Sequence, residues 1–289
     1  QWFCHLFLKL AGVFKMIHSR LATNTRDLGL LLLPIGSYAI LQPNHMILSS
    51  FYPMIKSLFL NIRGLSKPSH FRCLKKIIFQ QRIQFLVICE AHVNVILAES
   101  FRLKLGFEHV LCNTYGSLWI FYNAPFHLLL VGEGEQHFSF LVHHNFYAVP
   151  FSVSFVHALC TVEERKDLWS GLLRDKSLQG PWLVCGDFNV VINAGEKKGG
   201  RPFRLSEAVD FLDFMSFAEL FDAGFSGSSF TWCNNRFGRA RIWKRLDRLL
   251  INNSCYDAGL GVSVTHLVRD PSDHSPLLLS FTTRLNDKP

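Results

Sequence analysis

The chain reads Pro181-Trp182-Leu183-Val184-Cys185-Gly186-Asp187-Phe188-Asn189, a short apolar run that ends in an acid and an amide. Short apolar runs bounded by turn residues are typical of buried β-strands. The same arrangement recurs upstream, where Asn61 follows Ser57-Leu58-Phe59-Leu60 and Glu90 follows Phe85-Leu86-Val87-Ile88-Cys89. Polar side chains at the ends of several strands indicate one convergent site rather than scattered surface charge.

Two further polar positions adjoin apolar runs near the end of the chain. Asp247 lies beside Leu249-Leu250-Ile251, and Ser272-Asp273-His274 comes shortly before Leu277-Leu278-Leu279. Carboxylates, amides and an imidazole without cysteine ligands suit a hard cation such as Mg²⁺ or Mn²⁺. The chemistry that this set favours is phosphoester hydrolysis, in which a carboxylate activates water and donors stabilise the developing charge.

Composition sets limits on the class of protein. The chain has 289 residues, of which 49% are hydrophobic and 27 are Phe, so we expect a large aromatic core. A net charge of +8 favours a polyanionic partner. The eight cysteines form no CxxC pair, which predicts reduced thiols and an intracellular, nuclear or cytoplasmic location. The apolar stretch 28–41 is too short to span a bilayer comfortably, so no membrane partner is expected.

The pattern of runs predicts an α/β domain with extensive antiparallel pairing. We expect a poorly ordered N-terminal extension over 1–52, one domain over 53–283 and a tail over 284–289. The expected strands and helices follow in chain order: strands 57–61 and 85–89 around a helix at 71–81, an antiparallel meander within 107–159, a helix at 163–173, a strand at 182–185, helical spacing over 206–221, and strands near 229–233, 242–251 and 277–281.

Several motifs in this order resemble the exonuclease III/apurinic endonuclease-like branch of the endonuclease/exonuclease/phosphatase superfamily. More narrowly, the chain resembles the endonuclease domain of plant LINE-type (non-LTR) retrotransposons. The resemblance spans about 55–283 and implies a four-layer α/β sandwich, with two mixed, mainly antiparallel sheets packed face to face and helices outside. It also implies a monomeric, Mg²⁺-dependent domain that acts on DNA. No reverse-transcriptase region is present in the chain, so a relation to one stays open. The motifs are Leu60-Asn61-Ile62-Arg63-Gly64-Leu65, Cys89-Glu90, 181–189, 196–202, 225–232, 245–248 and 272–276.

The resemblance implies a role for each polar strand end. Glu90 would be the principal metal carboxylate with Asn61 beside it, and Asp273 would assist with metal or water. Asp187 would activate the attacking water, and Asn189 would hold the water or the phosphate. His274 would contact the scissile phosphate, oriented and kept cationic by Asp247.

The sequence departs from the family pattern at His157, which stands where the family usually has a tyrosine. A neutral imidazole still donates one hydrogen bond, but the histidine side chain is shorter than that of tyrosine and titrates near neutrality. Leu60 stands where Trp often precedes the Asn, which we interpret as a packing change.

Basic residues near the site are expected to contact phosphates. They are Lys197, Lys198 and Arg201 in one loop and the run from Arg236 to Arg248, which includes Arg239 and Arg241. The interpretation is a DNA endonuclease that nicks one strand and leaves a 3′-hydroxyl. Two alternatives stay open: a catalytically degenerate nucleic-acid-binding remnant, and a phosphoesterase of non-nucleic-acid substrates. Each site residue alone also has a structural interpretation as a turn, cap or core residue, and each basic run as a solvated face.

Overall fold

The computed structural model describes residues 54–176 and 180–283. The predicted extension over 1–52 and tail over 284–289 lie outside the described residues, and the extent of the domain stays a prediction. None of the helices within the described ranges has the length and apolarity needed to cross a membrane.

One sheet is built around the parallel pair β1 and β2, which α2 (Pro68–Gln81) connects. β1 is almost entirely buried because both faces of the sheet are covered, which explains its continuous apolar run. Its strand order is β11-β15-β16-β1-β2-β4-β3. The bounds are β1 Ile55–Asn61, β2 Phe85–Cys89, β3 His109–Cys112, β4 Leu118–Tyr122, β11 Ser226–Gly227, β15 Leu260–His266 and β16 Leu277–Thr283.

The second sheet repeats this arrangement around the parallel pair β7 and β8, which α4 (Val162–Asp175) connects. α4 begins at Thr161 with a capping box, in which Thr161 and Glu164 satisfy each other's backbone N–H groups. The strand order is β10-β14-β8-β7-β6-β5. The bounds are β5 His127–Glu133, β6 His137–His143, β7 Phe151–His157, β8 Trp182–Asp187, β10 Phe221–Asp222 and β14 Asp247–Ile251.

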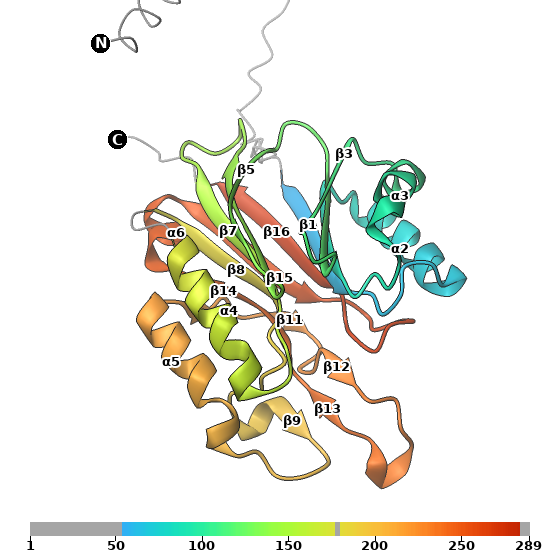
Figure 1. Cartoon of the computed structure of the whole chain (residues 1–289), viewed down its shortest axis with the longest axis vertical. Helices are drawn as coiled ribbons and strands as arrows, with labels where there is room; N and C mark the ends of the chain where they lie inside the picture. Colours follow the sequence, from blue (N-terminus) through green and yellow to red (C-terminus); the bar gives the residue numbers. More distant parts are fainter. Residues whose placement is uncertain (1–53, 177–179, 284–289) are drawn as a thin grey trace, which may run out of the picture. The chain divides into compact units, whose positions relative to one another are not determined.

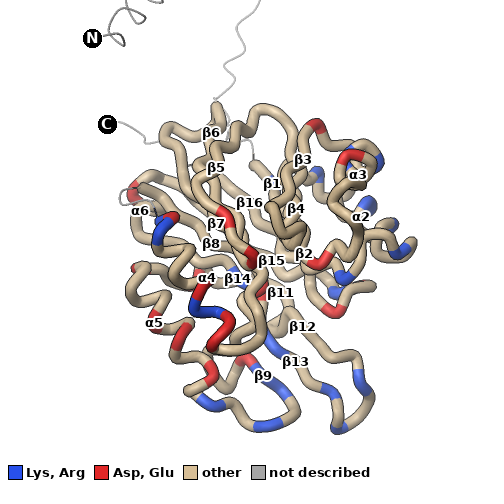
Figure 2. Tube along the Cα trace, viewed as in Figure 1, with Lys and Arg blue, Asp and Glu red and all other residues tan. Residues whose placement is uncertain are grey.

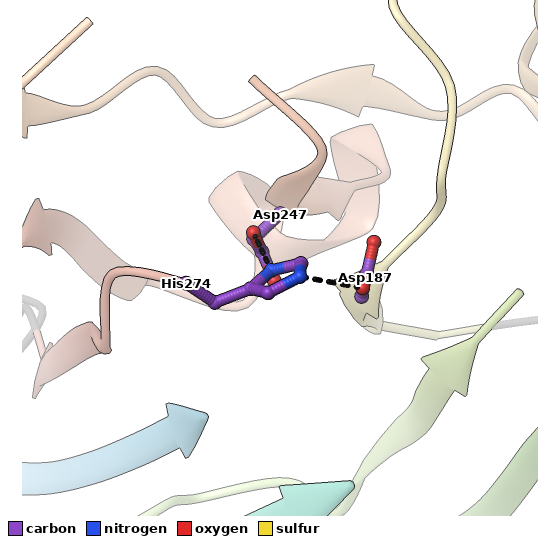
Figure 3. A group of neighbouring side chains, drawn as sticks. All are labelled: Asp187, Asp247 and His274. Carbon is purple, nitrogen blue, oxygen red and sulfur yellow. Dashed lines mark hydrogen bonds and ion pairs between the residues drawn. The ribbon is translucent and has the colours of Figure 1, made fainter. Parts of the chain in front are cut away.

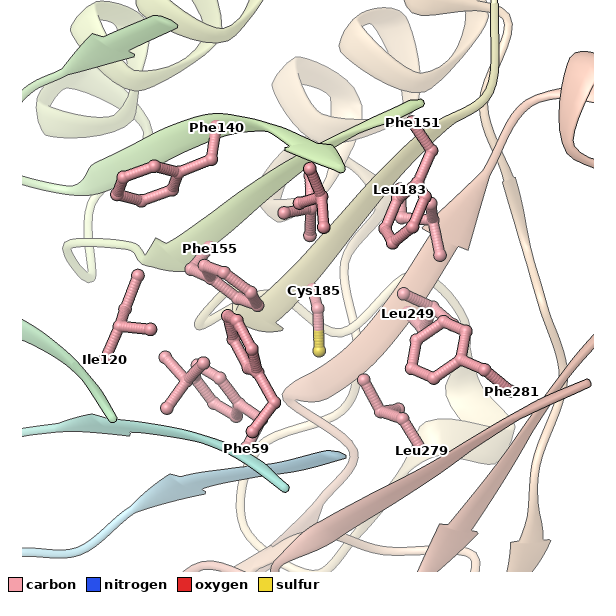
Figure 4. Packing of buried hydrophobic residues seen from close by; sticks show 14 of the residues in the cluster. Phe59, Ile120, Phe140, Phe151, Phe155, Leu183, Cys185, Leu249, Leu279 and Phe281 are labelled. Carbon is pink, nitrogen blue, oxygen red and sulfur yellow. The ribbon is translucent and has the colours of Figure 1, made fainter. Parts of the chain in front are cut away.

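The two sheets face each other across an apolar core, as Figures 1 and 4 show. Phenylalanines from both sheets meet there, and the rings of Phe85 and Phe155 stack with centroids 5.6 Å apart. The outer face of the first sheet packs against α2 and α3 (Ala98–Leu105). The outer face of the second packs against α4 and α5 (Val209–Ala218). The predicted four-layer α/β sandwich is therefore confirmed.

The structure differs from the prediction in how the strands are divided among the sheets. The meander within 107–159 divides, with β3 and β4 in the first sheet and β5, β6 and β7 in the second. A third, small sheet has the order β12-β13-β9 and holds basic residues. Its strands and the remaining helical segments are β9 Lys197–Lys198, β12 Trp232–Cys233, β13 Trp243–Lys244, α6 Asn253–Asp257 and the 3₁₀ turns Val95–Leu97, Ala194–Glu196, Leu205–Glu207 and Gly238–Ala240.

Gly186 is a position on β8 where the backbone of β7 leaves no space for a side chain. A Cβ at this position would lie 2.0 Å from the carbonyl oxygen of Val156 on β7. Any side chain would therefore push β8 away from β7. In the same register His157 lies opposite Asp187, the last residue of β8.

Candidate active site

The predicted polar residues stand at the same end of both parallel pairs. Asn61 and Cys89 are register partners at the ends of β1 and β2, so Glu90 emerges beside Asn61. In the facing sheet, Asp187 is the register partner of both His157 and Asp247. Because the two sheets pack face to face, their polar ends meet in one place.

Glu90 is the centre of one half of the site. Its Oε1 accepts hydrogen bonds from Asn61 Nδ2 at 2.8 Å and from His157 Nε2 at 3.2 Å. Its Oε2 accepts from Arg63 at 2.8 Å and lies 3.3 Å from His92 Nε2. Burial favours the neutral carboxyl, but the hydrogen bonds from His157 and Asn61 and the charge of Arg63 outweigh it and lower the pKa of Glu90 to about 2. Glu90 is therefore ionised at neutral pH.

Left-handed backbone conformations occur at four residues of the site. Arg63, Glu90, His92 and Asn189 have φ values of 51°, 52°, 49° and 52°. Such conformations are uncommon for residues other than glycine and cost free energy that the surrounding fold must offset. The reason for the strain at Asn189 is visible, because its backbone N–H donates to Asp187 Oδ1 at 3.0 Å and its side chain to the carbonyl of Ala158 at 2.6 Å.

The other half of the site is a buried row of two carboxylates and an imidazole (Figure 3). His274 Nδ1 lies 2.9 Å from Asp247 Oδ2, and its Nε2 lies 3.6 Å from Asp187 Oδ2. Asn61 joins the two halves, because its Nδ2 also donates to Asp187 Oδ2 at 3.1 Å.

The row is best described as an imidazolium between two carboxylates. Burial alone would lower the pKa of His274, but the charges of Asp247 and Asp187 outweigh it and raise the pKa to about 9. Burial also pushes the pKa of Asp247 up, yet the short hydrogen bond from His274 favours the ionised pair. A protonated imidazole has no lone pair for a metal. This row therefore suits charge stabilisation rather than cation binding, although its spacing would also fit an ion.

Asn61 and Glu90 offer a better environment for a hard cation. Asn61 Oδ1 is buried and accepts no hydrogen bond from the described residues. Such an unpartnered carbonyl oxygen beside an ionised carboxylate is the donor type that Mg²⁺ or Mn²⁺ prefers. The residues present thus fit a divalent cation, consistent with the prediction for Asn61 and Glu90; the roles themselves stay predictions.

Arg63 is the site residue that sequence reasoning missed. Its guanidinium bridges the two predicted metal carboxylates, with 2.8 Å to Glu90 Oε2 and 3.1 Å from Nε to Asp273 Oδ1. Trp232 Nε1 donates to the other oxygen of Asp273 at 3.0 Å. The available signal was the position of Arg63 two residues after Asn61, on the same strand end.

The predicted DNA-contact residues surround the small third sheet. Figure 2 shows one group of Lys and Arg around β9 and the β12–β13 hairpin and another around α2 and α3. Lys198, Arg201, Arg239 and Arg241 are exposed and Lys197 is half-buried.

The structure corrects the prediction of phosphate contact for two arginines of the 236–248 run. Arg245 and Arg248 are buried and pair with Glu196, at 2.9 Å and 3.0 Å. They also approach Asp222, at 2.8 Å and 3.5 Å. The expectation that they neutralise phosphates was wrong, because their charges are already compensated inside the fold.

Comparisons with known proteins agree with this architecture. The family model described as "Endonuclease/Exonuclease/phosphatase family" matches residues 58–274. No curated protein matches the chain by sequence.

Three solved structures share the fold at low sequence identity. The endonuclease domain of TRAS1, a telomere-specific non-LTR retrotransposon, has a TM-score of 0.58 and 12% identity, with 80% of this chain and 99% of that chain covered. The 3′-5′ exonuclease NExo from Neisseria meningitidis has a TM-score of 0.59 and 16% identity, with coverages of 79% and 100%. The AP endonuclease LMAP from Leishmania major has a TM-score of 0.58 and 13% identity, with coverages of 80% and 88%. With this fold and a family match over most of its length, the chain belongs to the endonuclease/exonuclease/phosphatase family.

Proposed function

We propose that the protein is a metal-dependent DNA endonuclease derived from a LINE-type retrotransposon. The observation that carries the proposal is the meeting of Asn61 and Asp187, 126 residues apart in sequence. They belong to one network of hydrogen bonds and ion pairs that includes Glu90 and His274. The family membership supports phosphodiester hydrolysis, and the likeness to the TRAS1 endonuclease favours DNA as the substrate.

The cation would be held by Glu90 and Asn61 Oδ1, with Asp273 near. When bound, it would polarise a non-bridging phosphoryl oxygen of the scissile phosphate. The remaining work belongs to Asp187 and Asp247 on the opposite sheet and to His274, which lies between β15 and β16. Asp187 accepts the proton of the attacking water while Asn189 fixes the direction of this carboxylate.

His274 supplies positive charge where the phosphoryl oxygens become more negative. Asp247 holds the imidazolium in place and Ser272 orients its backbone, because Ser272 Oγ accepts from His274 N at 3.1 Å. The water oxygen forms the new P–O bond, the bond from phosphorus to the 3′ oxygen breaks, and the leaving oxygen takes up a proton from solvent while Asp187 returns its proton to solvent. The products are a 3′-hydroxyl and a 5′-phosphate.

The test is nicking of supercoiled plasmid with and without Mg²⁺. Wild type should convert the plasmid to the open circle only with the cation, while Glu90→Gln and His274→Gln should each lose at least about 100-fold in rate. Arg72→Met, on the exposed surface of α2, is the matched control and should nick as wild type does. Nicking that persists in both site variants would sink the assignment. Salt-dependent DNA binding without any nicking would favour a degenerate binding remnant.

A further inference from the structure

A groove beside the active site holds two lysines that face each other. Lys197 on β9 and Lys244 on β13 are register partners on adjacent antiparallel strands. Side chains directly opposite on such strands lie about 5 Å apart at Cβ, and like charges in this position destabilise the pair. Within residues 54–176 and 180–283, neither ammonium group forms an ion pair with a carboxylate.

The environment makes this pairing costly. Both side chains are half-buried. Burial and the charge of Lys197 lower the pKa of Lys244. The groove between them has a volume of about 300 Å³. It also contains Asn189, which anchors Asp187, and residues at the start of α4, Thr161 and Val162. The carboxylate of Glu207 also lines the groove, but its charge does not outweigh burial and the charge of Lys197 in lowering the pKa of Lys244.

Lys244 also connects the groove with the site. Its ammonium lies 5.5 Å from the ring centroid of Trp232, whose Nε1 donates to Asp273. The side chain of Trp232 thus lies between Lys244 and Asp273. Asn189 lines the groove and contacts Asp187 directly. A group bound between the lysines would be a near neighbour of the scissile phosphate.

We propose that Lys197 and Lys244 form a second phosphate subsite, which binds a phosphodiester of the nucleic-acid strand next to the one that is cut. This inference rests on the proposed function for the identity of the strand, but not for the binding of phosphate. A bound anion screens the repulsion between the two ammonium groups. Relief of this repulsion favours anion binding over the free protein. The subsite also fixes the strand on the Asn189 side of the site.

The first experiment uses inorganic phosphate as the probe and the thermal midpoint as the readout. Phosphate, compared with chloride at equal ionic strength, should raise the Tm of wild type and leave that of Lys244→Met unchanged. Without phosphate, Lys244→Met should melt about 1–3 °C higher than wild type, because the repulsion is relieved. Lys76→Met removes an exposed lysine from α2 and should keep the phosphate shift. An equal phosphate shift in wild type and Lys244→Met would overturn the subsite.

The second experiment measures binding of a labelled DNA duplex in EDTA, where no cleavage occurs, over a series of salt concentrations. The slope of log affinity against log salt should be about 1 smaller for Lys244→Met and for Lys197→Met than for wild type and Lys76→Met. Folded variants with the wild-type slope would show that the strand does not use the subsite. If the phosphate shift depends on Lys244 but wild type never nicks plasmid, the subsite stands and the proposed function fails.

Discussion

Arg63→Met should increase the affinity of the site for a divalent cation. In the structure the guanidinium occupies the space between Glu90 and Asp273, so a cation that binds these carboxylates competes with it. The arginine side chain is 40% exposed and has solvent into which it can move. Methionine keeps the length of the side chain but carries no charge and no oxygen ligand.

The magnitude follows from the two contacts that are lost. A hydrogen bond to a charged partner contributes about 1.5–3 kcal/mol. Because Arg63 is partly exposed, we take its two contacts together as worth about one such hydrogen bond. At about 1.4 kcal/mol per factor of ten, Mn²⁺ should bind Arg63→Met roughly 10–100 times more tightly than wild type.

Mn²⁺ binding is measured by the loss of the free-ion electron paramagnetic resonance signal, which needs no activity. Arg72→Met carries the same loss of net charge on an exposed helix position and should bind as wild type does. Arg63→Met combined with Glu90→Gln should bind weakly, because the carboxylate proposed to hold the cation is gone. An affinity of Arg63→Met equal to or below that of wild type would refute competition between the guanidinium and the cation.

Three further outcomes follow from the site and its supporting strands. The pKa of His274 is raised to about 9 from 6.5, so its ion pair stabilises the fold fully below about pH 6.5 and is lost as pH rises through about 9. In EDTA, urea denaturation should therefore show about 3 kcal/mol of stability lost over this range, and His274→Gln should lack this component. Gly186→Ala should lower the free energy of unfolding by about 3 kcal/mol, since the new methyl meets the Val156 carbonyl; an unchanged urea midpoint would contradict this. His157→Tyr replaces the donor to Glu90 by a longer phenol and should raise the plasmid nicking rate; a lower rate would mean that the imidazole is adapted to this site.

The sequence was most informative where polar residues end apolar strands. Asn61, Glu90 and Asp187 could be predicted to converge because a buried strand can expose a carboxylate only at its end. The four-layer fold followed from the family resemblance, whereas the residues themselves indicated only an α/β domain. The division of the 107–159 meander between two sheets is not encoded in its local pattern, since a β-hairpin looks alike in either sheet.

Charge partners were the least predictable part of the site. Arg63, Arg245 and Arg248 carry the same side chain, yet one bridges two carboxylates at the site and the others are enclosed with Glu196. Which arginine meets which acid depends on contacts between residues 23 to 210 positions apart in the sequence. Local periodicity contains no information on such pairings, so the basic run appeared uniformly exposed.

The stacked pair Phe85 and Phe155 links the geometry of the polar site to the spacing of the sheets. One ring comes from β2, which leads into Glu90, and the other from β7, which ends at His157. The 3.2 Å contact between Glu90 and His157 therefore depends on how far apart this aromatic pair keeps its strands. In a deep mutational scan scored by nicking, interior aromatic positions far from any polar atom should group with the acidic ones, even in variants that still fold.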